Sequence, residues 1–178
     1  RQFSPADELS ALLATGSVTP DDVAALGAGI ARFHAAAAPA PAGSAYGRAE
    51  TVHRVTMDNF TELRALPEAA GWASQLPALE SRISTLHREL RPLMDERREI
   101  GRVRECHGDL HCGNVVRWAG ALTPFDGIEF EPALRFIDVI NDIAFLTMDL
   151  AERGHADLRR TVLQAWAETS GDWNGLPL

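Results

Sequence analysis

The sequence contains little cysteine, no long hydrophobic run and no cluster of basic residues. Two cysteines among 178 residues are too few for the disulfide framework of a small secreted domain. No apolar run approaches the ~20 residues that cross a bilayer, and the first residues do not resemble a signal peptide. We therefore expect a reduced, cytoplasmic protein with no membrane partner.

The charge of the chain excludes a second class of partner. Lysine and arginine together number 17 against 25 acidic residues, which gives a formal net charge of -8 and a pI of about 5.2. Proteins that bind the nucleic-acid backbone need basic patches, so we expect no nucleic-acid partner. The hydrophobic content of 46% is ordinary for a globular protein and predicts one domain over residues 1–178.

Helix signals dominate the first part of the chain. Ser4 before a proline, and Thr19 before another proline with Asp22 in the capping-box position, predict two helix starts. The Ala/Pro/Gly-rich stretch 35–47 predicts a surface loop rather than a domain boundary. A third helix should follow this loop and end near Pro67.

Later segments predict a mixture of helix and strand. A long helical pattern ends at Gly101, and Pro92 inside it should kink or break the helix. Residues 115–118 and 121–126 then predict two short strands around a tight turn. From Pro132 the pattern is helical again. The predicted fold class is a mainly helical α+β domain with a small β-hairpin.

The stretch Glu105–Asn114, "ECHGDLHCGN", is open to three interpretations. It is a metal cage, a phosphoryl-transfer loop, or a polar turn without chemistry. Zinc sites usually pair their ligands on separated knuckles, which argues against a cage made by one short segment. Under the other interpretations the two cysteines are small buried hydrophobic residues. The cage would require Cys106, His107, His111 and Cys112.

Spacing favours the phosphoryl-transfer loop. His107, Asp109 and Asn114 follow the pattern H-x-D-x-x-x-x-N of kinase catalytic loops. A carboxylate beside an attacking hydroxyl can accept its proton, and a nearby amide oxygen can bind Mg²⁺ without adding negative charge. Asp126, after the return strand of the hairpin, is in place to supply a second metal-binding oxygen.

These motifs resemble a known family. "HGDLHCGN" followed by "FDGIEF" resembles the aminoglycoside phosphotransferase/choline kinase branch of the protein-kinase-like fold. The run from Glu105 to Leu150 looks like a bacterial group of phosphotransferases whose members are often joined to a P-loop kinase domain. The resemblance implies the C-terminal lobe of such a fold, with ATP, Mg²⁺ and a small-molecule hydroxyl as its ligands. It does not imply that the acceptor is an aminoglycoside.

The resemblance also implies a role for each matching residue. Asp109 would be the catalytic base, and His111 would lie near the transferred phosphate. Asn114 and Asp126 would bind Mg²⁺ and, through it, the nucleotide. His107 would brace the loop backbone.

Acidic residues after the hairpin extend the candidate site. Projected onto one helix, Arg135, Asp138, Asp142 and Asp149 share a narrow stripe. This stripe is either a solvated face or, as the resemblance implies for Asp142, a buried support that holds the loop backbone. Glu129 could support the metal, meet substrate or be an ordinary surface carboxylate.

Other kinase parts are missing from this sequence. No glycine-rich phosphate loop and no V-A-I-K-like strand precede the helices, and the chain begins at Arg1 rather than at a methionine. We expect the N-terminal nucleotide-binding lobe to be absent and the isolated chain to be nearly inactive. Two alternatives remain open: a catalytically silent kinase-like binding or regulatory module, and a Cys/His zinc module.

Overall fold

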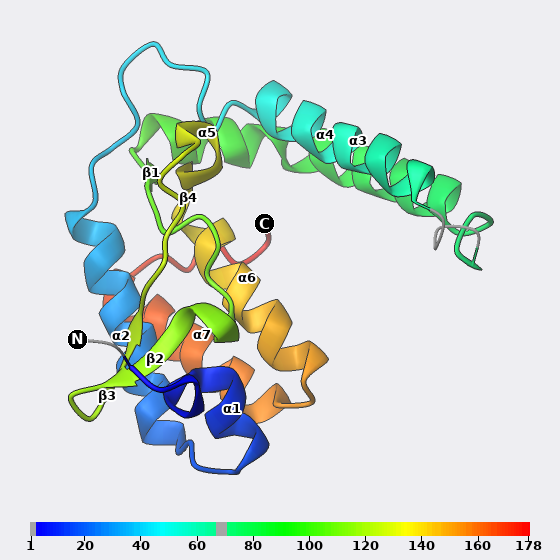
Figure 1. Ribbon diagram of the computed structural model, residues 1–178. Coiled ribbons are helices and arrows are strands. Elements are labelled where there is room, and N and C mark those ends of the chain that lie inside the picture. Colours follow the sequence, from blue (N-terminus) through cyan, green and yellow to red (C-terminus); the bar gives the residue numbers. More distant parts are fainter. Residues whose placement is uncertain (1–2, 67–70) are drawn as a thin grey trace. The chain divides into compact units, whose positions relative to one another are not determined.

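A computed structural model describes residues 3–66 and 71–178, and its fold is mainly helical α+β, as the sequence predicts (Figure 1). Small antiparallel strand pairs accompany the helices. The elements follow in the order η1 (Pro5–Asp7), α1 (Leu9–Ala14), α2 (Pro20–Ala36), α3 (Ala49–Ala65), α4 (Leu76–Glu99), β1 (Val103–Glu105), η3 (Cys112–Asn114), β2 (Val115–Trp118), β3 (Ala121–Pro124), α5 (Pro132–Arg135), β4 (Phe136–Asp138), α6 (Val139–Glu152) and α7 (Ala156–Ser170).

The chain divides into two compact units. The first, here called the core unit, contains the residues up to Ala40 together with Val103–Leu178. The second, the inserted unit, is Pro41–Arg102. Their boundary falls inside the Ala/Pro/Gly-rich stretch, which the sequence predicted to be a surface loop rather than a domain boundary. Amino-acid composition does not reveal such an inserted unit, because the unit is defined by which residues contact each other in the folded chain.

Helices α2, α6 and α7 build the apolar centre of the core unit. The predicted capping box of α2 is confirmed: Thr19 Oγ1 accepts from Asp22 N, and Thr19 N donates to the Asp22 carboxylate. Ile143, Leu146 and Trp166 are among the fully buried side chains of this centre. The core unit therefore has a hydrophobic interior of its own, to which the loop Cys106–Asn114 is attached.

Helices α2 and α7 approach each other at Gly27. A Cβ added at Gly27 would lie 2.4 Å from the backbone oxygen of Val162 on α7. We expect Gly27→Ala to lower the free energy of unfolding by about 1–3 kcal/mol, because the two helices must separate. Gly29→Ala is the matched control, because its Cβ would meet only the flexible Arg32 side chain at 3.9 Å. Urea unfolding should show Gly29→Ala neutral or stabilised, and equal losses in both variants would contradict the close approach.

The predicted hairpin is confirmed. Strands β2 and β3 pair antiparallel, with Val115 opposite Pro124 and Trp118 opposite Ala121. The turn between them uses Ala119 and Gly120, both with positive φ, as a two-residue hairpin turn of the type I′ class requires. This hairpin carries the ends of the candidate loop.

One helix prediction is wrong. The segment from Pro132 is not a continuous helix, because Phe136–Asp138 form strand β4 and pair antiparallel with β1. The pairing partner is distant in sequence, and its backbone hydrogen bonds outweigh the local helical pattern. Asp138 then caps α6 by accepting from Ile140 N. Arg135 and Asp138 consequently precede α6, and only Asp142 and Asp149 of the predicted stripe lie on it.

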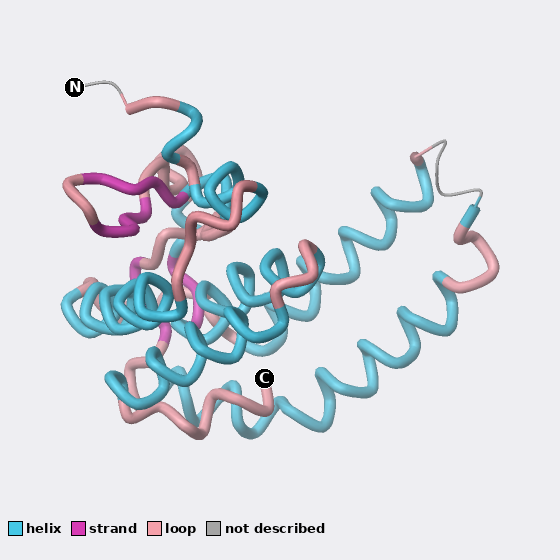
Figure 2. The backbone as a smooth tube through the Cα atoms, turned by 90° about the horizontal axis from the view of Figure 1, so that it is seen from below, coloured by secondary structure: helices cyan, strands magenta, loops and turns pink. Residues whose placement is uncertain are grey.

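The inserted unit is built on the helices α3 and α4, which run side by side in opposite directions (Figure 2). Pro67, the predicted end of α3, lies outside the described residues. Pro92 was predicted to kink or break the helix, and it does not break it, since α4 continues through it to Glu99. Pro92 and Arg88 are both exposed, so water can satisfy the Arg88 carbonyl that loses its helical partner.

Across the part of the chain that the structure describes, no helix combines the length and apolar character needed to span a membrane.

Candidate functional site

The candidate catalytic loop joins β1 to β2 and brings Asp109, His111 and Asn114 together. Asn114 Nδ2 donates to the backbone oxygen of Asp109 at 2.9 Å and to its Oδ2 at 3.2 Å. His111 Nε2 lies 3.5 Å from the same carboxylate oxygen. His111 Nδ1 accepts from Gly113 N, so in the neutral ring the proton is on Nε2 and faces Asp109. The Asp109 side chain is 42% exposed and thus accessible to a substrate.

His107 fastens this loop to the segment that carries Asp126. Its Nε2 donates to Phe125 O at 2.8 Å, while its Nδ1 accepts from Asp109 N at 3.3 Å. On the far side of Asp126, Ile128 N donates to His107 O at 2.9 Å. His107 is mostly buried, so these bonds fix both backbone segments without offering the ring to solvent.

Asp126 itself is exposed and adopts a left-handed backbone conformation, with φ of 60°. The strain of this conformation is held by the bonds that flank it at Phe125 and Ile128. Within residues 3–66 and 71–178, its carboxylate has neither a hydrogen-bond nor an ion-pair partner. The structure therefore brings the Asp126 backbone next to the loop and leaves its oxygens available to a ligand.

Arg135 supports the neighbouring segment. Its Nη1 donates to the backbone oxygens of Ile128 and Glu129, and its Nη2 pairs with Glu105 Oε1 at 2.9 Å. The Glu129 carboxylate is exposed, and among the described residues no contact of this side chain assigns it to the metal site. Arg135 is thus a support that the helical-stripe interpretation did not identify.

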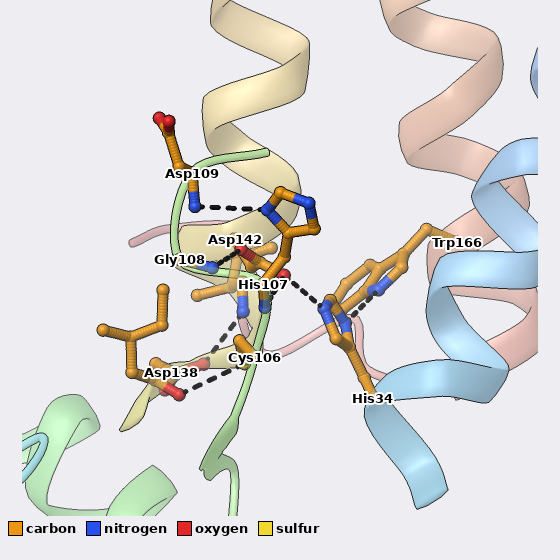
Figure 3. A network of polar contacts seen from close by, with 10 residues as sticks. His34, Cys106, His107, Gly108, Asp109, Asp138, Asp142 and Trp166 are labelled. Atoms are coloured by element: carbon orange, nitrogen blue, oxygen red, sulfur yellow. Dashed lines mark hydrogen bonds and ion pairs between the residues drawn. The ribbon is translucent and has the colours of Figure 1, made fainter. Parts of the chain in front are cut away.

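Asp142 on α6 holds the loop from the interior side (Figure 3). Its Oδ1 accepts from Gly108 N at 3.0 Å, and its Oδ2 accepts from His107 N at 3.1 Å. Its exposed fraction is only 1%, which is incompatible with a solvated face. Gly108 has φ of 85°, and a Cβ there would lie 2.8 Å from Leu134 O, so this clamp depends on glycine. In Figure 3 the Asp109 side chain points away from Asp142.

Asp149, two turns further along α6, holds the other end of the loop. Its Oδ2 accepts from Cys112 N at 2.8 Å, and its Oδ1 accepts from Arg153 Nε at 2.8 Å. Desolvation alone would raise the pKa of Asp149, but the bonds from Cys112 and Arg153 outweigh it and lower that pKa. One helix therefore supplies two carboxylates to the same loop, spaced at i and i+7.

The structure does not group the four proposed cage residues, all of which it describes, as potential metal ligands. Among the described residues, the potential metal-ligand group that assembles is His34, Cys106 and Asp142, which lacks His107, His111 and Cys112. Trp166 Nε1 donates to His34 Nδ1, and His34 Nε2 donates to Asp142, so neither ring nitrogen has a lone pair free for a metal. Burial raises the pKa of both cysteine thiols, as expected for small buried residues.

Comparison with known proteins adds relatives without an assigned activity. The chain is 27% identical over 172 residues to an uncharacterized protein of Mycobacterium bovis and to an uncharacterized protein in each of two strains of Mycobacterium tuberculosis. The match covers 97% of this chain and 34% of each relative, so the chain spans about a third of their length. No family model matches the chain. No solved structure matches it.

His34 and Trp166 are the residues of this region that sequence reasoning missed. No motif of the sequence points to either residue, although His34 follows Ile30 by one helical turn and so continues the apolar stripe of α2. That position was the available signal that His34 faces the interior. Nothing local connects it to Trp166, which lies 132 residues later in the chain.

Proposed function

We propose that this chain is the C-terminal lobe of a protein-kinase-like phosphotransferase that moves the γ-phosphate of ATP to a hydroxyl of a small molecule. The observation that carries the proposal is the contact between Asp109 and Asn114 in a loop clamped from behind, with Asp126 beside it. This arrangement leaves one carboxylate accessible for proton transfer and two oxygen donors for a cation. A cytoplasmic location belongs to the same proposal.

The donor set fits Mg²⁺. The Asn114 amide nitrogen is used by Asp109, which leaves the amide oxygen as the ligand atom, and Asp126 adds a carboxylate that has no partner among the described residues. Both are hard oxygen donors of the kind that Mg²⁺ prefers. When bound with ATP, the ion would neutralise negative charge on the phosphates.

The residues of the loop account for the rest of the reaction. Asp109 accepts the proton of the acceptor hydroxyl while the new oxygen–phosphorus bond forms. The bond from the γ-phosphorus to the bridging oxygen breaks, and ADP leaves with that oxygen. His111 presents its Nε2–H on the Asp109 side of the loop, where it is available to donate to a phosphate oxygen.

The proposal places further parts of the enzyme outside this chain. The nucleotide would also need an N-terminal lobe, and a fused P-loop kinase domain is a further candidate partner. The mycobacterial relatives are long enough to contain both, because the match covers 34% of each. The acceptor is proposed as a small molecule on the strength of the resemblance alone.

The test is Mg²⁺-dependent binding of ATP to the full-length protein, measured by calorimetry. We expect binding with Mg²⁺ that weakens about tenfold or more in Asp126→Asn, a loss of about 1.4 kcal/mol. Asp21→Asn removes the same charge from an exposed position on α2 and should bind like the wild type. Thermal stabilisation of the isolated chain by ATP gives a second readout of the half-site.

Three results would count against the proposal. ATP binding that is equal with and without Mg²⁺, or equal in Asp126→Asn and wild type, would remove Asp126 from the metal site. Failure of the full-length protein to bind ATP would favour the silent kinase-like module instead.

A further inference from the structure

Trp166, His34 and Asp142 form a buried hydrogen-bonded chain behind the candidate catalytic loop (Figure 3). Trp166 Nε1 donates to His34 Nδ1 at 3.0 Å, and His34 Nε2 lies 3.0 Å from Asp142 Oδ2. The three side chains come from α7, α2 and α6, and their exposed fractions are 0%, 3% and 1%. None of the steps proposed above uses His34 or Trp166.

The indole fixes the tautomer of His34. An indole N–H is a donor only, so Nδ1 of the neutral imidazole must be the acceptor and Nε2 must carry the proton. The Nε2–H then points at Asp142 Oδ2 and donates to it. The opposite tautomer would set two N–H groups against each other at Trp166 and a lone pair against the carboxylate.

Three N–H groups consequently converge on one carboxylate. Asp142 accepts from His34 Nε2, His107 N and Gly108 N, and two of these donors are the backbone immediately before Asp109. The bond from His34 gives Oδ2 of Asp142 a partner on the side away from the loop. Without it, the carboxylate would be held only by the two loop amides that it positions, and a displacement of about 1 Å at a reacting group can cost 10²-fold in rate.

We propose that His34 and Trp166 are positioning residues: through Asp142 they fix the backbone of His107 and Gly108, and thereby the place of Asp109. The catalytic part of this inference rests on the proposed phosphotransferase function. The clamp itself is a property of the folded chain and is testable without any activity.

The first experiment measures the clamp directly. Proton–nitrogen correlation spectra of the histidine rings should show His34 as the neutral Nε2–H tautomer. Trp166→Phe keeps an aromatic side chain but deletes the donor to Nδ1, so the ring should keep its Nε2–H bond to Asp142 and lose the contact that fixes its position. Trp166→Phe should also raise the hydrogen-exchange rates of the His107 and Gly108 amides about tenfold or more over the rates in the control variant Val162→Ala. Val162 is a buried residue of the same helix that takes no part in the hydrogen bonds between Trp166, His34 and Asp142. An Nδ1–H tautomer, or amide exchange no faster than in Val162→Ala, would overturn the inference.

The second experiment measures transfer by the full-length protein. We expect His34→Ala to lower kcat by ~10–100-fold with little change in the KM for ATP, as for groups that orient a functional residue from behind. His34→Gln should recover part of this loss, because its amide offers a donor to Asp142 and an acceptor to Trp166. Val162→Ala controls for lost core packing and should keep kcat at temperatures where it is folded.

The outcomes separate the two proposals. If His34→Ala does not fold, Trp166→Phe takes its place in the kinetic comparison. Unchanged kcat in a folded His34→Ala or Trp166→Phe protein would overturn the positioning role. Absence of transfer in the wild type would refute the proposed function, and the tautomer and amide-exchange results would then decide the clamp on their own.

Discussion

Asp109→Asn in the full-length protein is expected to lower kcat for phosphoryl transfer by ~10²–10⁴-fold, the usual contribution of a general base. Asparagine has nearly the same shape, and its amide oxygen can still accept from Asn114 Nδ2, so the loop should keep its geometry. It cannot take up the proton of the acceptor hydroxyl. Steady-state kinetics with ATP and the acceptor would measure the loss.

The binding of ATP separates chemistry from folding in this variant. Because Asp109 is 42% exposed, the free energy of unfolding should change by about 0.5 kcal/mol or less. ATP should bind Asp109→Asn about as well as it binds the wild type. Asp21→Asn is again the matched control and should retain full kcat. A variant at position 109 with kcat within threefold of the wild type would show that Asp109 is not the base.

Asp142→Asn is expected to lower the free energy of unfolding by about 3 kcal/mol. One of the two carboxylate oxygens becomes an NH₂ group that faces a buried N–H donor, and the remaining bonds lose the charge that strengthens them. An unsatisfied buried donor costs about 1–3 kcal/mol by itself. Urea unfolding at neutral pH would measure the change.

Glu152→Gln is the control for this prediction. It makes the same isosteric change at an exposed position of the same helix, and its effect should stay within about 0.5 kcal/mol. Faster exchange of the Gly108 amide in Asp142→Asn would locate the damage at the loop. Equal stability of the two variants would mean that the Asp142 bonds contribute little to the folded state.

Local patterns predicted several elements correctly. Thr19, Pro20 and Asp22 form a capping box from side chains within one turn, so no other part of the fold is needed. The β2–β3 hairpin is likewise local, because Ala119 and Gly120 alone bring its strands together. The spacing of Asp109 and Asn114 also places both residues in one short loop, where their side chains are in contact.

Other elements required information from distant parts of the chain. Phe136–Asp138 were predicted helical because their pairing with β1 is not encoded nearby. Pro92 was expected to kink or break α4, yet Arg88 and Pro92 are exposed, so water can hydrate the Arg88 carbonyl and the helix continues. The α6 stripe was ambiguous between solvent and interior, and only burial decides between the two.

By itself, the sequence determined the start of α2, the hairpin and the spacing of His107, Asp109 and Asn114, since each depends on residues within a few turns of one another. The other predicted start is wrong for an α-helix, because Ser4 caps the short η1 and α1 begins only at Leu9. Only the tertiary structure decided what holds the loop. Asp142 meets His34 across 108 residues, and Trp166 meets His34 across 132. These bonds exist because folding packs three helices around a common centre and removes water from their polar groups, which must then pair with each other.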